Sequence, residues 1–240
     1  MTSMPGATPL GKFGMATERS RMLKLGFQKR SRQPYRILCL GAHSDDIEIG
    51  CGGTILELLR TRRDLEFKWI VFSSGKDRER EARRSASLFL KSAAKQNIEV
   101  LDFRNSFFPS ESAKIKEYFE ALKIAASPDL ILTHARDDLH QDHRVINQLT
   151  WNTWRDHFIL EYEIPKYDGD LGRPNFFVPF DRKIAGLKIK HLMSCFKTQS
   201  NKHWFTKDTF LGLMRIRGLE ANSSGNFAEA YYARKVVLDL

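Results

Sequence analysis

The sequence contains no long apolar run and few cysteines. Among its 240 residues, no window approaches 18 consecutive apolar residues, so no segment is predicted to span a membrane. The first residues lack the apolar core of a secretory signal. Cys39, Cys51 and Cys195 are widely spaced, which argues against a disulfide framework and against a cysteine metal site. We therefore expect a cytoplasmic protein.

Acidic residues are scarce at the N-terminus. Residues 1–33 hold seven Lys or Arg against one acid, Glu18, and so account for six of the ten net positive charges. Glycine, proline and the lack of an apolar period predict a flexible basic tail over residues 1–34. A nucleic-acid-binding arm and an organelle presequence are the alternatives for this tail. Residues 35–240 are only mildly basic and are predicted to form one domain, so nucleic acid is not the expected partner.

The part from Tyr35 onward alternates between short apolar runs and amphipathic stretches. Strands are predicted over residues 36–41, 67–72, 98–103, 129–133 and 232–238, and helices over residues 54–63, 77–95, 111–126, 145–155, 181–197 and 202–221. Strands that alternate with helices through short links form parallel sheets with right-handed crossovers. The pattern predicts an α/β fold, a Rossmann-like three-layer sandwich with a mostly parallel central sheet.

Two clusters of acids and histidines follow predicted strands. His43, Asp45 and Asp46 come directly after the first strand, and the run 140–143 (His-Gln-Asp-His) follows the fourth. Parallel strands place their carboxyl ends at one edge of a sheet, where open α/β sheets bind ligands. We therefore expect the two clusters to meet, although they are about a hundred residues apart.

His43, Asp46 and His143 together form a set of two histidines and one carboxylate. Such a set suits a catalytic zinc that keeps a fourth position open for water. A single histidine of this kind is more often a core or loop side chain, but two acid-histidine clusters at strand ends favour a metal site. Iron or cobalt can occupy the same set of ligands.

The remaining charged residues of the clusters have different predicted roles. Asp45, adjacent to a ligand, is placed to accept a proton from water; the alternative is that it caps the following helix. Asp142 is predicted to orient His140 and keep it protonated. His140 would then stabilise an oxyanion or protonate a leaving amine.

The glycines of the segment 50–54 (Gly-Cys-Gly-Gly-Thr) resemble a phosphate-binding turn. The segment has neither the G-x-G-x-x-G spacing nor a following Gly-Lys-Ser/Thr, so nucleotide binding is not favoured. We predict instead that these glycines let the backbone turn sharply behind the metal ligands and pack closely against the sheet.

The two motifs resemble those of the LmbE-like or PIG-L family of zinc-dependent de-N-acetylases. The family's His-Pro-Asp-Asp-Glu and Gly-Cys-Gly-Gly-Thr segments are similar to residues 43–47 and 50–54, and its His-x-Asp-His motif is similar to residues 140–143. Weaker similarities lie at residues 198–199, 217–218 and 228–230. The resemblance covers roughly residues 36–240.

The resemblance implies the same roles that the residues themselves suggest. It implies zinc on His43, Asp46 and His143, Asp45 as general base, and His140 with Asp142 as the charge-stabilising or acid partner. Two departures stand out. Ser44 replaces the usual proline, and Ile47 stands where an acid is common, with Glu48 following it.

The sequence gives fewer indications of the residues that bind the substrate. The family often has an arginine at the start of the helix after the second strand, and among Arg78, Arg80, Arg83 and Arg84 we choose Arg80. A solvated helix face is the alternative. Residues 161–175, rich in turn formers and aromatic residues, either form a wall of the substrate pocket or a plain surface connection.

These observations predict a metal-dependent hydrolase that removes acetyl from an N-acetylated sugar or sugar conjugate of the N-acetylglucosamine type. A hydrolase of another amide, such as a thiol-sugar conjugate, is the alternative within enzymes. A non-catalytic metal-containing protein that binds its partner through the basic tail is the alternative from another class.

Overall fold

The computed structural model describes residues 24–26 and 33–237. The predicted tail, residues 1–34, lies almost entirely outside the described residues. The strands are β1 (Tyr35–Gly41), β2 (Leu65–Val71), β3 (Lys95–Val100), β4 (Leu130–His134), β5 (Ile159–Tyr162), β6 (Phe176–Phe180) and β7 (Phe227–Tyr232). The helices are α1 (Asp46–Thr61), α2 (Lys76–Phe89), α3 (Phe108–Ala125), α4 (Gln141–Thr153), α5 (Arg182–Cys195) and α6 (Lys207–Glu220), with a short 3₁₀ turn at Lys197–Gln199.

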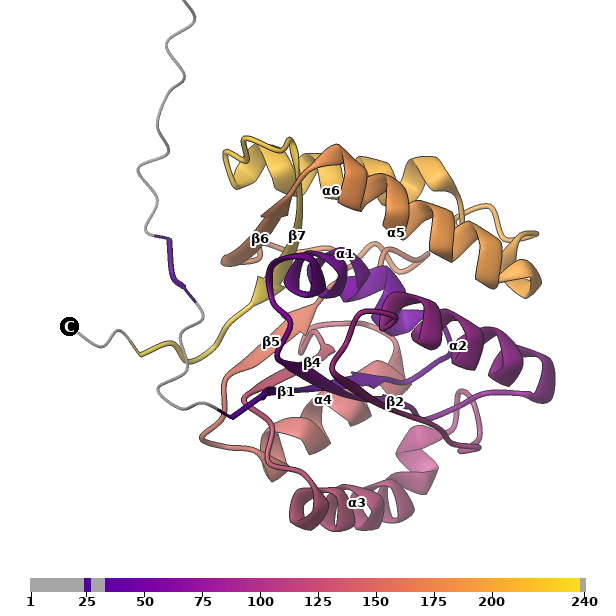
Figure 1. Cartoon of the computed structure of the whole chain (residues 1–240). Coiled ribbons are helices and arrows are strands. Elements are labelled where there is room, and N and C mark those ends of the chain that lie inside the picture. Colours follow the sequence, from indigo (N-terminus) through magenta and orange to yellow (C-terminus); the bar gives the residue numbers. More distant parts are fainter. Residues whose placement is uncertain (1–23, 27–32, 238–240) are drawn as a thin grey trace, which may run out of the picture.

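One seven-stranded sheet forms the centre of the molecule, in the order β3-β2-β1-β4-β5-β7-β6. The first five strands in this order are parallel, whereas β7 runs antiparallel to both of its neighbours, β5 and β6. Helices α1, α2, α5 and α6 lie on one side of the sheet and α3 and α4 on the other (Figure 1). The predicted three-layer α/β fold with a mostly parallel sheet is confirmed.

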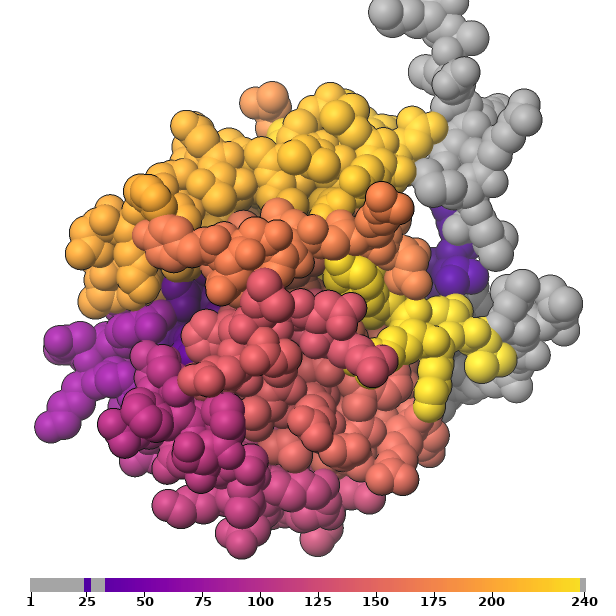
Figure 2. All heavy atoms as spheres, turned by 180° about the vertical axis from the view of Figure 1, so that it is seen from behind, coloured from indigo at the N-terminus to yellow at the C-terminus, as the bar shows by residue number. Residues whose placement is uncertain are grey.

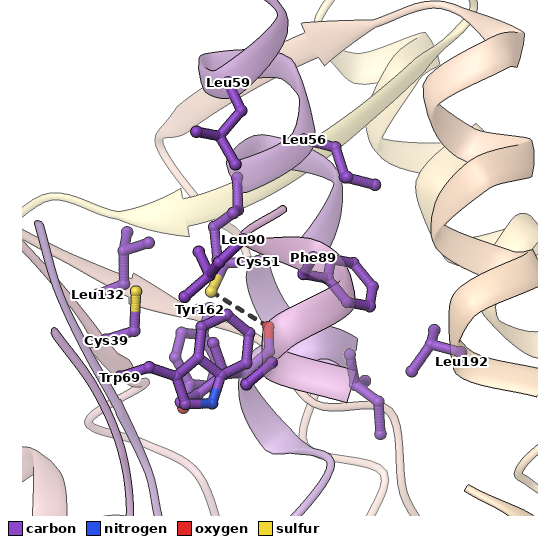
Figure 3. Close-up of a cluster of buried hydrophobic side chains, with 14 of the residues drawn as sticks. Cys39, Cys51, Leu56, Leu59, Trp69, Phe89, Leu90, Leu132, Tyr162 and Leu192 are labelled. Atoms are coloured by element: carbon purple, nitrogen blue, oxygen red, sulfur yellow. Dashed lines mark hydrogen bonds between the residues drawn. The ribbon is translucent and has the colours of Figure 1, made fainter. Parts of the chain in front are cut away.

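The central strands are apolar on both faces because helices cover both faces. In β1, Leu38 and Leu40 face the core under α3 and α4, while Ile37 and Cys39 face the core under α1 and α2. Figure 3 shows part of this second core, in which the Cys51 thiol donates to the Ile47 carbonyl at 3.2 Å. Close packing on both faces of the sheet holds β1 in place, and therefore also positions the residues that follow its carboxyl end.

The glycine segment has a different conformation from the predicted one. Helix α1 begins at Asp46, eight residues before the predicted start, so Gly50, Gly52 and Gly53 lie inside a helix and make no sharp turn. Close packing is what these glycines provide. A Cβ on Gly50 would lie 2.2 Å from the Tyr162 ring. Glycine backbone forms part of the packing face of this helix, which is why side-chain periodicity placed its start too late.

Three other elements differ from the prediction. Strands β5 and β6 were not predicted, and β7 ends at Tyr232, where the predicted closing strand was to begin. Residue 238, the end of that predicted strand, lies outside the described residues. The segment after β7, in yellow, lies at the surface beside the middle part of the chain (Figure 2). In this segment, Arg234 donates to the side chain of Asn147 in α4 at 2.9 Å. Within residues 24–26 and 33–237, no helix has the length and apolar character needed to cross a bilayer.

Candidate metal centre

The two acid-histidine clusters meet at the carboxyl edge of the neighbouring strands β1 and β4. His43 follows β1, and Asp46 is the first residue of α1. His140 is the N-cap of α4, and His143 lies in the first turn of that helix. The short connections after the two strands therefore bring residues 100 positions apart within hydrogen-bond distance.

The ligand atoms of His43, Asp46 and His143 have the spacing that a tetrahedral metal requires. His43 Nδ1 lies 3.2 Å from His143 Nε2 and 3.3 Å from Asp46 Oδ2, and the last two atoms are 3.5 Å apart. Ligands at about 2.0–2.1 Å from a tetrahedral ion lie roughly 3.3 Å from one another. The three residues therefore fit a zinc ion without rearrangement.

Each of these histidines has a carboxylate on its other ring nitrogen. Asp142 Oδ2 lies 3.1 Å from His43 Nε2, and Asp138 Oδ2 lies 2.9 Å from His143 Nδ1. Such pairs fix the ring orientation and tautomer of metal-binding histidines. Asp142 had been predicted to orient His140. Its carboxylate instead contacts His43 and accepts backbone N–H bonds from Ser106 at 2.6 Å and Phe108 at 3.1 Å.

The cluster is buried, and its pKa values reflect burial and neighbouring charge. Burial lowers the pKa of His43, but Asp46 and Asp142 outweigh this effect and raise the pKa to about 9. Burial and the adjacent His134 lower the pKa of His143 to about 3. Burial raises the pKa of Asp46, yet the three histidines around it hold that pKa well below its usual range. Asp46 is therefore an anion beside His43 and His143.

Asp45 occupies the N-cap position of α1 but does not act as a cap. Its side chain makes no capping hydrogen bond, and its Oδ1 accepts from the Arg78 guanidinium at 2.7 Å. Burial raises the pKa of Asp45, and the positive charge of Arg78 opposes this increase. A buried carboxylate that lies beside the ligand set and does not cap the helix is available to exchange a proton.

Arg78, rather than Arg80, is the arginine of α2 that reaches the site. The Arg80 side chain is 82% exposed and pairs with the equally exposed Asp77. The Nε of Arg78 is buried and has no hydrogen-bond partner among the described residues. Arg78 lies in the first turn of α2, which points toward the site, whereas Arg80 lies on the outer face of the helix.

His140 packs its ring against both histidine ligands. The ring centroid lies 4.8 Å from that of His43 and 4.5 Å from that of His143. Its Nδ1 accepts from the backbone N–H of Asp142 at 3.2 Å. Burial and the positive charge of His43 lower the pKa of His140, so Asp142 does not keep this ring protonated as predicted.

Sequence reasoning did not assign roles to Asp138, His134 or Lys166. Asp138 bonds the ligand His143 and also accepts from Lys166 Nζ, 3.1 Å away in the β5–β6 connection. His134, the last residue of β4, stacks on His143 with ring centroids 3.8 Å apart. The Asp138 carboxylate lies two residues before His140 in the same polar run, but nothing in the sequence distinguishes it from its exposed neighbour Asp137.

A cavity of about 180 Å³ lies beside Asp138, and none of His43, Asp46 and His143 is among its lining residues. It is bounded by Arg136, Asp137, Lys166, Leu171, Tyr232 and Arg234, among others. The connection between β5 and β6 supplies one wall of this cavity. The cavity touches the metal centre through Asp138.

Comparison with known proteins agrees with the fold and the motifs. Residues 38–154 match the model of the PIG-L family, which is described as GlcNAc-PI de-N-acetylase. The matched residues include both motifs, and β5 and the C-terminal elements lie outside them. A search of curated proteins by sequence found no significant relative.

Solved structures with the same fold share little sequence with the chain. The conserved protein TT1542 from Thermus thermophilus is 16% identical, with a TM-score of 0.66 over 85% of this chain and 96% of that one. The N,N'-diacetylchitobiose deacetylase from Pyrococcus horikoshii is 19% identical, with a TM-score of 0.61 over 82% and 83%. The 4-carboxy-2-hydroxymuconate hydratase from Pseudomonas putida is 15% identical, with a TM-score of 0.67 over 86% and 99%.

At these identities the structural likeness establishes the fold, and the family assignment comes from the match that contains both motifs. Because one of these proteins is a hydratase by name, the fold alone does not specify a reaction. By the match over residues 38–154, which contain both motifs, the chain is assigned to the PIG-L (LmbE-like) family.

Proposed function

We propose that this protein is a zinc-dependent N-deacetylase that removes acetyl from an N-acetylated sugar or sugar conjugate. The observation that carries the proposal is the spacing of His43 Nδ1, Asp46 Oδ2 and His143 Nε2, with Asp45 beside them. The family's description as a de-N-acetylase of a GlcNAc conjugate supports the same class of substrate.

His43, Asp46 and His143 would hold the zinc ion. A zinc ion held there supplies a Lewis acid for the acetamide carbonyl and lowers the pKa of water toward neutrality. Asp138 and Asp142 keep the two imidazoles in the tautomers that present the ligand nitrogens. The chemistry of this donor set, two imidazoles and one carboxylate, leaves a position for substrate.

Asp45 acts as general base, taking the proton of the attacking water and delivering it to the leaving nitrogen. The Arg78 guanidinium holds the Asp45 carboxylate in place through the bond to Oδ1. Because the Arg78 Nε has no partner among the described residues, the same side chain is also placed to bind a substrate oxygen.

His140 acts as a hydrogen-bond donor to the oxyanion. Its Nδ1 accepts the Asp142 backbone N–H, so a neutral ring carries its proton on Nε2. The hydrogen bonds among the described residues leave that Nε2 unused. A donor aimed at a developing oxyanion contributes through electrostatic stabilisation.

The cavity beside Asp138 provides room for the part of the substrate that does not react. Arg136, Asp137 and Tyr232 offer donors and acceptors there, and Leu171 offers an apolar face. Mixed polar and apolar walls suit a sugar-like group, since small-molecule sites combine apolar lining with a few polar groups. The part of the β5–β6 connection that bounds this cavity, with Lys166, Asp170 and Leu171, would then select the conjugate.

A screen of N-acetylated amino sugars tests the function. Purified protein should contain about one zinc per chain, and incubation with free, nucleotide-linked and lipid-linked N-acetylamino sugars should give a product lighter by one acetyl. Removal of the metal with a chelator should stop acetate release, and added zinc should restore it. Release of another acid would favour a different amide, such as a thiol-sugar conjugate.

The main alternative is a non-catalytic protein that acts through its basic N-terminus. Deletion of residues 1–33 separates the two possibilities. The deacetylase proposal requires that the shortened protein keep its hydrolytic activity. Loss of the biological role on deletion, with no hydrolysis by either protein, would support the binding-protein alternative.

A further inference from the structure

A buried ion pair contacts the backbone of helix α1. Lys188 of α5 and Glu229 of β7 lie 2.6 Å apart, with side chains only 2% and 4% exposed. Lys188 Nζ donates to the Ile49 carbonyl at 2.6 Å. Glu229 accepts from the backbone N–H groups of Gly53 and Thr54, each at 2.7 Å. In a regular helix the Ile49 carbonyl and the Gly53 N–H bond each other.

The glycine segment allows Glu229 to come this close to the helix backbone. A Cβ on Gly53 would lie 2.9 Å from Glu229 Oε1 and 2.6 Å from the Phe180 ring, so no larger residue fits there. The Tyr231 hydroxyl donates to Glu229 Oε2 at 3.1 Å, which completes the bonding of the carboxylate. The Gly-Cys-Gly-Gly-Thr and Ala-Glu-Ala segments, distant in sequence, are therefore two halves of one contact.

Helix α1 carries a metal ligand at its first residue, Asp46. The Ile49 carbonyl, which Lys188 holds, lies less than one turn after Asp46. A buried ion pair loses much of its attraction to the cost of desolvation, so general stabilisation does not account for this arrangement. Its hydrogen bonds go to the ligand helix on one side and to the C-terminal elements on the other.

We propose that Lys188 and Glu229 are positioning residues that lock α1 against the C-terminal elements and so set Asp46 for metal binding. This inference rests on the proposed function, because it assumes that Asp46 is a ligand. It assigns to the C-terminal part of the chain, beyond the family match at residues 38–154, a direct part in assembling the metal centre.

A second buried ion pair provides a matched control. Arg217 of α6 and Glu163, which follows β5, lie 2.6 Å apart with side chains 6% and 5% exposed. Their bonds run to each other, to Glu220 and to the Gly172 carbonyl, and none of these groups lies on α1. Glu163→Gln and Glu229→Gln therefore make the same chemical change in two similarly buried pairs, of which only the Glu229 pair has hydrogen bonds to the ligand helix.

The test compares zinc affinity in folded Glu229→Gln, Glu163→Gln and wild-type protein, with thermal unfolding measured in parallel. We expect Glu229→Gln to lower zinc affinity by about 10-fold or more, in the range for groups that orient metal ligands. Its cobalt-loaded form should show an altered visible spectrum. Glu163→Gln should bind zinc within about twofold of wild type at a comparable loss of thermal stability, since none of the hydrogen bonds of its pair reaches α1.

Two results would overturn the proposal. One is an equal change in zinc affinity for Glu229→Gln and Glu163→Gln. The other is measured on wild-type protein, so it does not depend on whether a variant folds. If the contact to α1 favours zinc binding, zinc binding must stabilise the contact by the same free energy. Zinc should therefore slow amide hydrogen exchange at Gly53 and Thr54. Unchanged exchange there refutes the coupling. If wild-type protein binds no zinc at all, the proposed function itself fails, which is a distinguishable outcome.

Discussion

The Asp142 carboxylate lies 3.1 Å from His43 Nε2, joining two segments that are 99 residues apart in the chain. Asp142 also accepts hydrogen bonds from the backbone N–H groups of Ser106 and Phe108. A residue of the second cluster therefore fixes the orientation of His43, which belongs to the first. Asp138 holds His143 in the same way from within the second cluster. The orientations of His43 and His143 therefore depend on two different carboxylates.

Replacement of Asp142 or Asp138 by asparagine should weaken zinc binding by about 10–100-fold, because each ligand ring loses its charged partner. Chelator competition measures the affinity. Asp137→Asn is the matched control: Asp137 is adjacent and exposed, and the carboxylate that bonds His143 is that of Asp138. Equal affinity in all three variants would contradict the assignment.

Asp45→Asn should reduce kcat by about 10²–10⁴-fold, the range for loss of a general base or acid, while zinc content remains near one per chain. The amide keeps the size of the side chain and can still accept from Arg78, so folding should be preserved. Acetate release and metal analysis check the two halves of this prediction. Full activity in this variant would show that another group takes the proton.

Arg78 and Arg80 give a direct test of which arginine serves the site. Arg78→Ala should lower kcat/KM by roughly 10-fold or more, because it removes a charged hydrogen bond from Asp45. Arg80→Ala should stay within about twofold of wild type, since exposed ion pairs contribute little. Steady-state kinetics of both variants on one substrate decide the matter, and the reverse order of effects would restore Arg80 as the contact.

Two glycines in helices should respond oppositely to alanine. Gly50→Ala forces a Cβ within 2.2 Å of the Tyr162 ring and should destabilise the protein by about 1–3 kcal/mol. Gly186→Ala in α5 meets nothing within 4 Å and should stabilise by up to about 1 kcal/mol. Chemical denaturation measures both changes. A neutral Gly50→Ala would mean that α1 can move away from β5.

Glu99 should give a pH-dependent contribution to stability. Burial raises its pKa, but hydrogen bonds from Lys68 and Tyr118 outweigh this effect and lower the pKa below its usual value. A lowered pKa means stability that is present above the unfolded-state pKa and lost as the pH falls through the folded-state pKa. Glu99→Gln should therefore lower the melting temperature at neutral pH, and the difference from wild type should shrink as the solution is made acidic. A constant difference would contradict the assignment.

Much of the fold was predictable because it depends on local pattern. The apolar runs at β1, β2 and β4 alternate with amphipathic helices, and such alternation has one common solution, a parallel sheet covered on both sides. Strands β5 and β6 were not predicted, because a four-residue strand and an edge strand containing Pro179 have weak local signals. Their partner β7 pairs with β6 across a long stretch of intervening chain, a contact that no local pattern encodes.

The start of α1 shows a different kind of limit. A sequence with three glycines in four residues predicts a turn, since glycine is a poor helix former. In the folded protein Tyr162, Phe89 and Phe180 pack against this glycine surface, and the tertiary contacts outweigh the propensity. The same contacts explain why glycine is required there.

By itself, the sequence determined the fold class and the meeting of His43, Asp46 and His143, because strand ends deliver these side chains to one edge of the sheet whatever the details of packing. Only the tertiary structure decided which neighbours serve them. Asp142 is close to His140 in sequence. In the structure, however, its carboxylate accepts from the Ser106 backbone N–H and contacts His43. The sequence pattern did not distinguish Arg78 from Arg80, but their positions around α2 make Arg78 a partly buried partner of Asp45 and leave Arg80 solvated. Hydrogen-bond partners depend on orientation at the scale of an ångström, and that orientation is set by packing between distant segments.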